Sequence, residues 1–108
     1  MTGDTFIEMA LSFAGTEQKK HVNRIGFRVT GKRMFATYLD TENTANLFLS
    51  KAEQSVFCEI DAHNIYPLPN KWGEKGMTTF VLNNVPADIV MEALLSAYND
   101  VIKPKKKG

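Results

Sequence analysis

Cysteine is almost absent from this sequence, because Cys58 is its single example among 108 residues. One thiol excludes a disulfide within the chain and leaves no cysteine partner for a zinc cluster. Histidine is nearly as scarce, and neither His21 nor His63 has further ligands at a recognisable metal-binding spacing. We therefore expect no metal and no other cofactor, and we interpret Cys58 as a small buried side chain rather than a reactive thiol.

Long apolar segments and catalytic motifs are also missing. No run approaches the roughly 20 apolar residues of a membrane-spanning helix. The N-terminus carries Asp4 and Glu8 where a signal peptide would carry positive charge. The chain has no phosphate-binding glycine loop, no nucleophile elbow and no convincing pair of catalytic carboxylates. We therefore expect a cytoplasmic protein without membrane attachment, and we do not expect an enzyme.

What is present is the composition of one small domain. Hydrophobic residues make up 44% of the chain, with seven Phe, three Tyr and one Trp, which is enough apolar material for one core. We expect a single domain over residues 1–102 and a basic tail over residues 103–108, and we favour a monomer. The tail is interpreted as a solubilising end.

Charge is unevenly distributed along the chain, although the formal net charge is only +1. The segment from Lys19 to Leu39 holds six cations and no carboxylate, whereas the remaining body is strongly acidic. Such separation favours an oriented approach of an anionic partner, but the small net charge argues against tight, sequence-independent binding of nucleic acid. The six cations are Lys19, Lys20, Arg24, Arg28, Lys32 and Arg33.

The first predicted element is a helix. Thr5 and Glu8 match a capping box at its start, and Gly15 suits its end. Its apolar residues fall at i, i+3, i+4 and i+7 and so share one face. They are Phe6, Met9, Ala10 and Phe13.

Three consecutive strands are predicted next by alternating apolar residues. They cover residues 25–29, 34–39 and 45–49, and they should form an antiparallel meander. Gly31 can adopt the positive φ of the hairpin turn between the first two. The alternation predicts that Arg28 faces outward.

Two further helices and a strand complete the prediction. Ser50 and Glu53 form a second capping box, and Pro86 begins the last helix, which runs to Ile102. The helix after Ser50 should bury Ala52, Val56, Phe57 and Ile60, and the last helix should bury one row of Val90, Leu94, Ala97 and Val101 beside a second row of Met91, Leu95, Tyr98 and Ile102. With a strand over residues 78–82, this order predicts an α+β two-layer domain, an antiparallel sheet with helices on one face.

These elements carry a resemblance to a known family. The order and spacing of eight short motifs are similar to those of the MmcQ/YjbR family: Leu11-Ser-Phe-Ala-Gly15, Phe27-Arg-Val-Thr-Gly-Lys32, Phe35-Ala-Thr37, Leu47-Phe-Leu-Ser50, Tyr66-Pro-Leu-Pro69, Trp72-Gly73, Gly76-Met-Thr78 and Ala97-Tyr98. The resemblance implies a small bacterial domain of the secretion-chaperone-like architecture, described as DNA-binding through a double wing. The chain departs from the family pattern at Ala14, commonly Pro, and at Met77, commonly Trp.

The resemblance and the charge pattern together give a DNA-binding hypothesis. The basic strand-hairpin face would contact phosphates, the Gly31 hairpin would act as a wing, and Arg28 and Arg33 are the better candidates for base-edge contacts. Lys71 and Lys75 would form a second basic lip around Trp72. The alternative for these cations is a solvated strand face that pairs with acids elsewhere.

Other functions stay open. An edge strand could dock a protein partner, as in a chaperone-like adaptor. A small-molecule site would need a closed apolar pocket around Trp72 with a few convergent polar groups, to which His21 and Tyr66 are candidates to contribute. Trp72 could stack on a ligand or anchor its loop to the core. Clustering of His21, Arg24 and Trp72 in one deep pocket would favour an enzyme.

Overall fold

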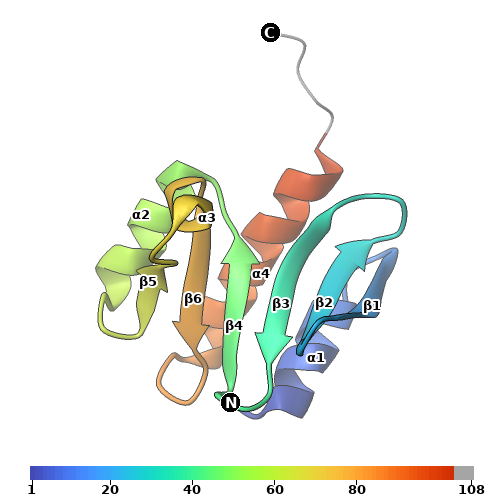
Figure 1. Ribbon diagram of the computed structural model, residues 1–108, viewed down its shortest axis with the longest axis horizontal. Coiled ribbons are helices and arrows are strands. Elements are labelled where there is room, and N and C mark those ends of the chain that lie inside the picture. The colour runs from blue at the N-terminus through green and yellow to red at the C-terminus, as the bar shows by residue number, and fades with distance from the viewer. Residues whose placement is uncertain (104–108) are drawn as a thin grey trace, which may run out of the picture.

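Residues 1–103, the part of the chain that the computed structural model describes, form four helices and six strands (Figure 1). Their order is α1 (Gly3–Leu11), β1 (Thr16–His21), β2 (Arg24–Val29), β3 (Met34–Leu39), β4 (Thr44–Phe48), α2 (Lys51–Ile60), β5 (Ile65–Pro67), α3 (Lys71–Glu74), β6 (Met77–Val81) and α4 (Ala87–Ile102). The strands make one antiparallel sheet in the order β1-β2-β3-β4-β6-β5. Residues 104–108, which are most of the predicted basic tail, lie outside the described residues.

The domain has two layers. Figure 1 shows α1, α2 and α4 behind the sheet, while the face toward the viewer is left open except where α3 lies near one end of β6. The predicted α+β fold with helices on one face of an antiparallel sheet is therefore confirmed. We call the uncovered side the open face.

The core lies between the sheet and the three long helices. Phe6 of α1 stacks on Tyr38 and meets Phe27 edge-on, with ring centroids 5.7 Å and 5.8 Å away. On α4 the predicted row of Val90, Leu94, Ala97 and Val101 is buried, as expected. In the second predicted row Leu95 and Ile102 are exposed, because a two-layer fold has no further layer to cover the outer side of α4.

The first helix begins earlier than its predicted capping box. Its N-cap is Thr2, whose Oγ1 accepts a hydrogen bond of 3.2 Å from the backbone N–H of Thr5. Thr5 therefore lies inside the first turn, and the prediction of a Thr5 cap is wrong. The helix ends at Leu11, and Gly15 instead adopts a φ of 76° in the turn that leads into β1.

Strand β1 has no counterpart among the predicted elements. Its residues, Thr16–His21, are all polar, so no apolar alternation marks them as a strand. They nevertheless pair with β2 along their whole length, from Thr16 opposite Val29 to His21 opposite Arg24. The meander therefore has one strand more than predicted, and β1 forms the edge of the sheet.

The capping box of α2 is confirmed, but its predicted buried face is wrong. Ser50 Oγ accepts from the N–H of Glu53, and the Glu53 carboxylate accepts from the N–H of Ser50. Only Phe57 of the four predicted residues is buried, whereas Ala52, Val56 and Ile60 are exposed. The helix is rotated so that Gln54 faces inward, where its amide has backbone acceptors.

Within residues 1–103, two residues other than glycine have positive φ, and we expect them to respond in opposite ways to replacement by glycine. Val22, 83% exposed between β1 and β2, has a φ of 58°, which is strained for a β-branched residue. Val22→Gly should raise the free energy of unfolding by about 1 kcal/mol. Asn43 has a φ of 51°, but its side chain bonds Tyr38 Oη, Met1 O and Asn83 Oδ1.

Asn43→Gly should therefore lower the free energy of unfolding by about 1–2 kcal/mol, because the lost side-chain hydrogen bonds outweigh the relief of the backbone. Urea denaturation of the two variants beside the unchanged chain measures both effects. Equal signs for the two substitutions would contradict the assignment of strain to Val22.

Candidate functional site

The register of the sheet places a polar row across the open face. Residues directly opposite one another on neighbouring strands project from the same face. Starting from Gly26 opposite Thr37, the pairs continue through Asn46 and Thr79. The full row, from β1 to β5, is Lys19, Gly26, Thr37, Asn46, Thr79 and Tyr66.

The middle of this row is tied together by side-chain hydrogen bonds. Asn46 Oδ1 accepts from Thr79 Oγ1 at 2.8 Å, and Thr37 Oγ1 accepts a longer bond of 3.4 Å from Arg24 Nη1. Both Thr37 and Asn46 are buried although they lie on the uncovered side of the sheet. Larger neighbouring side chains therefore stand above them and leave them at the bottom of a groove.

Two adjoining pockets of about 240 Å³ and 350 Å³ make up that groove. They share Phe48, Trp72 and Met77, so the apolar side chains lie between them. We call the two together the open-face groove. Its other lining residues are Arg33, Leu49 and Lys75 in the smaller pocket and His21, Arg24, Met34, Thr37 and Asn46 in the larger one.

Helix α3 holds Trp72 over one end of the sheet. Asn70 caps this short helix, since its Oδ1 accepts from the N–H groups of Trp72 and Gly73 at 2.9 Å and 3.4 Å. The indole is 55% exposed, so Trp72 does not anchor its loop by burial in the core. Lys75 Nζ lies 5.4 Å from the centre of the Trp72 ring, within the range of a cation–π contact.

The predicted basic residues differ in where they point. Arg33 lies 6.0 Å from the Phe48 ring at the rim of the groove, and Arg24 lies in the groove itself. Arg28 is engaged across the β1–β2 pair, where its Nε is 2.6 Å from Glu17 Oε2. Lys20 lies opposite Ile25, so it projects from the helix side of β1, unlike Lys19. The structure thus does not place Lys20 with the others.

Charge is separated between the two layers of the described residues. Helices α1, α2 and α4 carry seven acids and one cation, whereas the strands, their turns and α3 carry eight cations and four acids. Asp61 and Lys103, the C-caps of α2 and α4, are counted in neither set. The helical acids are Asp4, Glu8, Glu53, Glu59, Asp88, Glu92 and Asp100, and the helical cation is Lys51. The cations of the sheet layer are Lys19, Lys20, Arg24, Arg28, Lys32, Arg33, Lys71 and Lys75, and its acids are Glu17, Asp40, Glu42 and Glu74.

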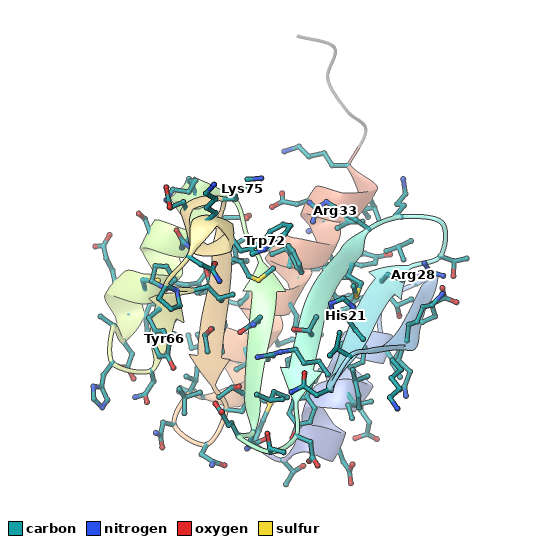
Figure 2. The ribbon with its side chains drawn as sticks, viewed as in Figure 1. His21, Arg28, Arg33, Tyr66, Trp72 and Lys75 are labelled. Atoms are coloured by element: carbon teal, nitrogen blue, oxygen red, sulfur yellow. The ribbon has the colours of Figure 1, made fainter. Side chains whose placement is uncertain are left out.

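Several residues predicted from distant parts of the sequence come together at the groove. His21, Arg24 and Trp72 line the same pocket, although it is an open groove rather than the deep pocket that would favour an enzyme. Figure 2 shows Arg33, Trp72 and Lys75 along one end of the sheet and His21 farther down. Tyr66 lies apart, on edge strand β5 of the same face.

The sequence interpretation missed Phe48 and the groove floor. The signal for Phe48 was present, because the inward side chains of Leu47 on β4 and of Leu49 directly after it require Asn46 and Phe48 to project from the other face. An outward-facing phenylalanine is unusual on a solvated strand face. Here Phe48 lines the groove together with Trp72 and Met77.

Other candidate chemistry receives no support within residues 1–103. These residues contain no group of three His, Cys, Asp or Glu side chains that could hold a metal ion. None of the helices in the described part is long and apolar enough to cross a membrane. Cys58 is half-buried, and desolvation raises the pKa of its thiol, which makes the reactive thiolate rarer.

Comparisons with known proteins identify the fold. No protein-family model matches the chain, and no curated protein matches it. The crystal structure of protein DR2400 from Deinococcus radiodurans, described as a DUF419 domain, is similar with a TM-score of 0.73. The two share 19% sequence identity over 89% of this chain and 75% of that one. DUF419 is the YjbR/MmcQ-like family, so the resemblance seen in the sequence is supported at the level of the fold.

Proposed function

We propose that this YjbR-like domain binds DNA on the open face of its sheet. The separation of charge between the layers is the observation that carries the proposal. A polyanion is attracted to the sheet side and repelled by the acidic helices, so the domain would approach DNA with its open face leading. The orientation follows from how the charges are distributed, while the small net charge limits the strength of the attraction.

The cations of the open face lie on two sides of the groove, where they would contact phosphates. Lys19 and Arg24 lie on the β1–β2 side of the groove, and Arg33 and Lys75 lie at its α3 end. Such contacts supply affinity and orientation and do not read sequence by themselves. Arg28 is a weaker candidate for a base contact than the sequence suggested, because it would have to leave Glu17.

Adjacent lysines on β1 provide a matched test of the proposed face. We expect Lys19→Glu to weaken binding of a labelled random-sequence DNA by about 10-fold at 0.1 M salt and to lower the salt slope by about 1. Lys20→Glu makes the same charge change on the other side of the strand and should alter binding less than about 2-fold, because the Debye length there is about 10 Å. Fluorescence anisotropy of the full-length variants measures both.

The basic tail is present in both lysine variants, so its contribution cancels in the comparison. Equal weakening by the two substitutions would show that the net charge rather than the open face governs binding. Absence of DNA binding by the unchanged chain at low salt would refute the proposal itself.

Docking of a protein by strand addition is less well supported by the two sheet edges. Strand β1 exposes Lys19 and Lys20, and β5 is three residues long and ends at Pro67. Lysine on an edge, a short edge strand and proline are features that discourage pairing with another strand. The protein-interaction alternative therefore lacks a favourable edge within the described sheet.

A further inference from the structure

We infer that the open-face groove holds an unpaired base, so that the DNA bound by this domain is single-stranded; this rests on the proposed function. The groove combines three features along its length, an apolar middle, cationic ends and a polar floor. Each matches one part of a nucleotide.

The apolar middle offers surfaces for a base. Trp72 and Phe48 are the aromatic residues of the groove, and Met34 and Met77 complete the apolar lining of its larger pocket. Its volume of about 350 Å³ is near the small end of the range for ligand pockets, about 300–1,000 Å³. Stacking on an aromatic side chain accepts any base, because every base has a π face.

The cations stand at both ends of this apolar middle. Arg33 and Lys75 line the smaller pocket, and Arg24 lines the larger one beside His21. A base held between them would place the phosphates before and after it toward opposite ends. Neither a neutral aromatic ligand nor an apolar peptide has negative charges that would pair with these cations.

The floor provides hydrogen-bonding groups for a base edge. Asn46 is 7% exposed, and its Oδ1 is occupied by Thr79. Among residues 1–103 no acceptor pairs with its Nδ2, and no side-chain nitrogen or oxygen atom of this part is both buried and unpaired, so the two N–H groups of Nδ2 are accessible from the groove. An unpaired base presents its Watson–Crick edge to such a donor, whereas in a duplex that edge is occupied.

Duplex DNA would use the groove poorly. Its bases are stacked on one another, so their faces cannot reach Trp72 or Phe48 without being flipped out of the helix. A single strand presents base faces at no such cost. The groove therefore predicts preference for the single strand over the duplex, a distinction that the surface charge alone would not make.

The single tryptophan of the chain makes the inference directly measurable. Binding of a 12-nucleotide oligothymidine should quench Trp72 fluorescence, and its affinity should exceed that of a blunt duplex by about 10-fold or more at equal salt. In anisotropy measurements Trp72→Leu should weaken binding of the single strand by about 10-fold. Tyr66→Leu, which removes another exposed aromatic from the same face but outside the groove, should change it by less than about 2-fold. Circular dichroism melting of both variants checks folding.

The outcomes separate this inference from the proposed function. Equal binding of single strand and duplex without quenching would overturn the groove as a base site while leaving DNA binding by the open face in place. Binding of the single strand that is insensitive to Trp72→Leu would overturn it as well. Failure of both DNA forms to bind would overturn the proposed function together with this inference.

Discussion

Replacing Gly76 by alanine should destabilise the domain by about 4 kcal/mol or more, a rare magnitude for one methyl group. Gly76 has a φ of 115°, which residues with a Cβ rarely adopt. A Cβ there would overlap the carbonyl oxygen of Leu49, a backbone atom at the end of β4 that cannot rotate away. The carbonyl of Gly76 also accepts from the N–H of Leu49 at 3.2 Å, so the two segments cannot separate without losing that bond.

Gly31→Ala is the matched control for this prediction. Gly31 also has a positive φ, of 82°, but a Cβ there would meet no atom within 4 Å. Its substitution should cost about 1 kcal/mol, from the backbone conformation alone. Urea denaturation of both variants measures the difference, which reports the steric overlap at Gly76. Similar losses of stability in the two variants would show that the backbone between β4 and α2 moves easily to relieve the overlap.

Gln54→Leu should lower the free energy of unfolding by about 1–3 kcal/mol. The side chain is buried, and its Nε2 donates to the carbonyls of Gly73 at 2.9 Å and Met77 at 3.2 Å. Leucine has a similar size but removes both hydrogen bonds, each worth about 0.5–1.5 kcal/mol. The two carbonyls keep their backbone donors, the N–H groups of Gly76 and Leu68. Because Gly73 adjoins Trp72, the emission spectrum of Trp72 should shift toward that of a solvated indole.

Gln18→Leu makes the same substitution on exposed strand β1 and should change stability by less than about 0.5 kcal/mol. Thermal and urea denaturation, followed by both circular dichroism and Trp72 emission, measure these effects. Destabilisation by Gln54→Leu without a change in Trp72 emission would indicate that Gln54 supports the core and not α3.

The predictable parts of the fold are those in which apolar residues repeat with the period of a helix or strand. Ile25, Phe27 and Val29 alternate on β2, and Val90, Leu94 and Ala97 share one side of α4, so both elements were identified with the correct buried face. Strand β1 could not be found in this way. Its pairing depends on the backbone of β2 rather than on any apolar side chain of its own.

Burial of polar side chains limited the rest of the prediction. The apolar pattern of α2 favours Val56 and Ile60 as buried residues, yet Gln54 faces inward, where carbonyls of α3 and β6 accept hydrogen bonds from its amide. Those acceptors come from later in the chain, so the sequence of α2 itself contains no signal for them. Asn46 is hidden from sequence reasoning for the same reason, since its partner Thr79 is on β6.

The sequence predicted several residues of the candidate site, but it did not predict how they are arranged in space. The cationic segment and Trp72 stand out in composition, and their meeting at one groove depends on β4 and β6 lying between β3 and the α3 loop. The faces of β1 also matter, because Lys19 and Lys20 are equivalent in composition but project to opposite sides. A count of charges along the chain treats them alike.

The polar edge strand β1 also affects how stable one wall of the groove is against local unfolding. It brings His21 to the larger pocket, yet its residues, Thr16–His21, add no side chain to the buried core. Segments with few buried apolar contacts open at free energies well below that of global unfolding. One wall of the groove therefore belongs to a part of the sheet that should open more readily than the central strands. DNA bound across the proposed site would contact β1 and so stabilise this wall of the groove against opening.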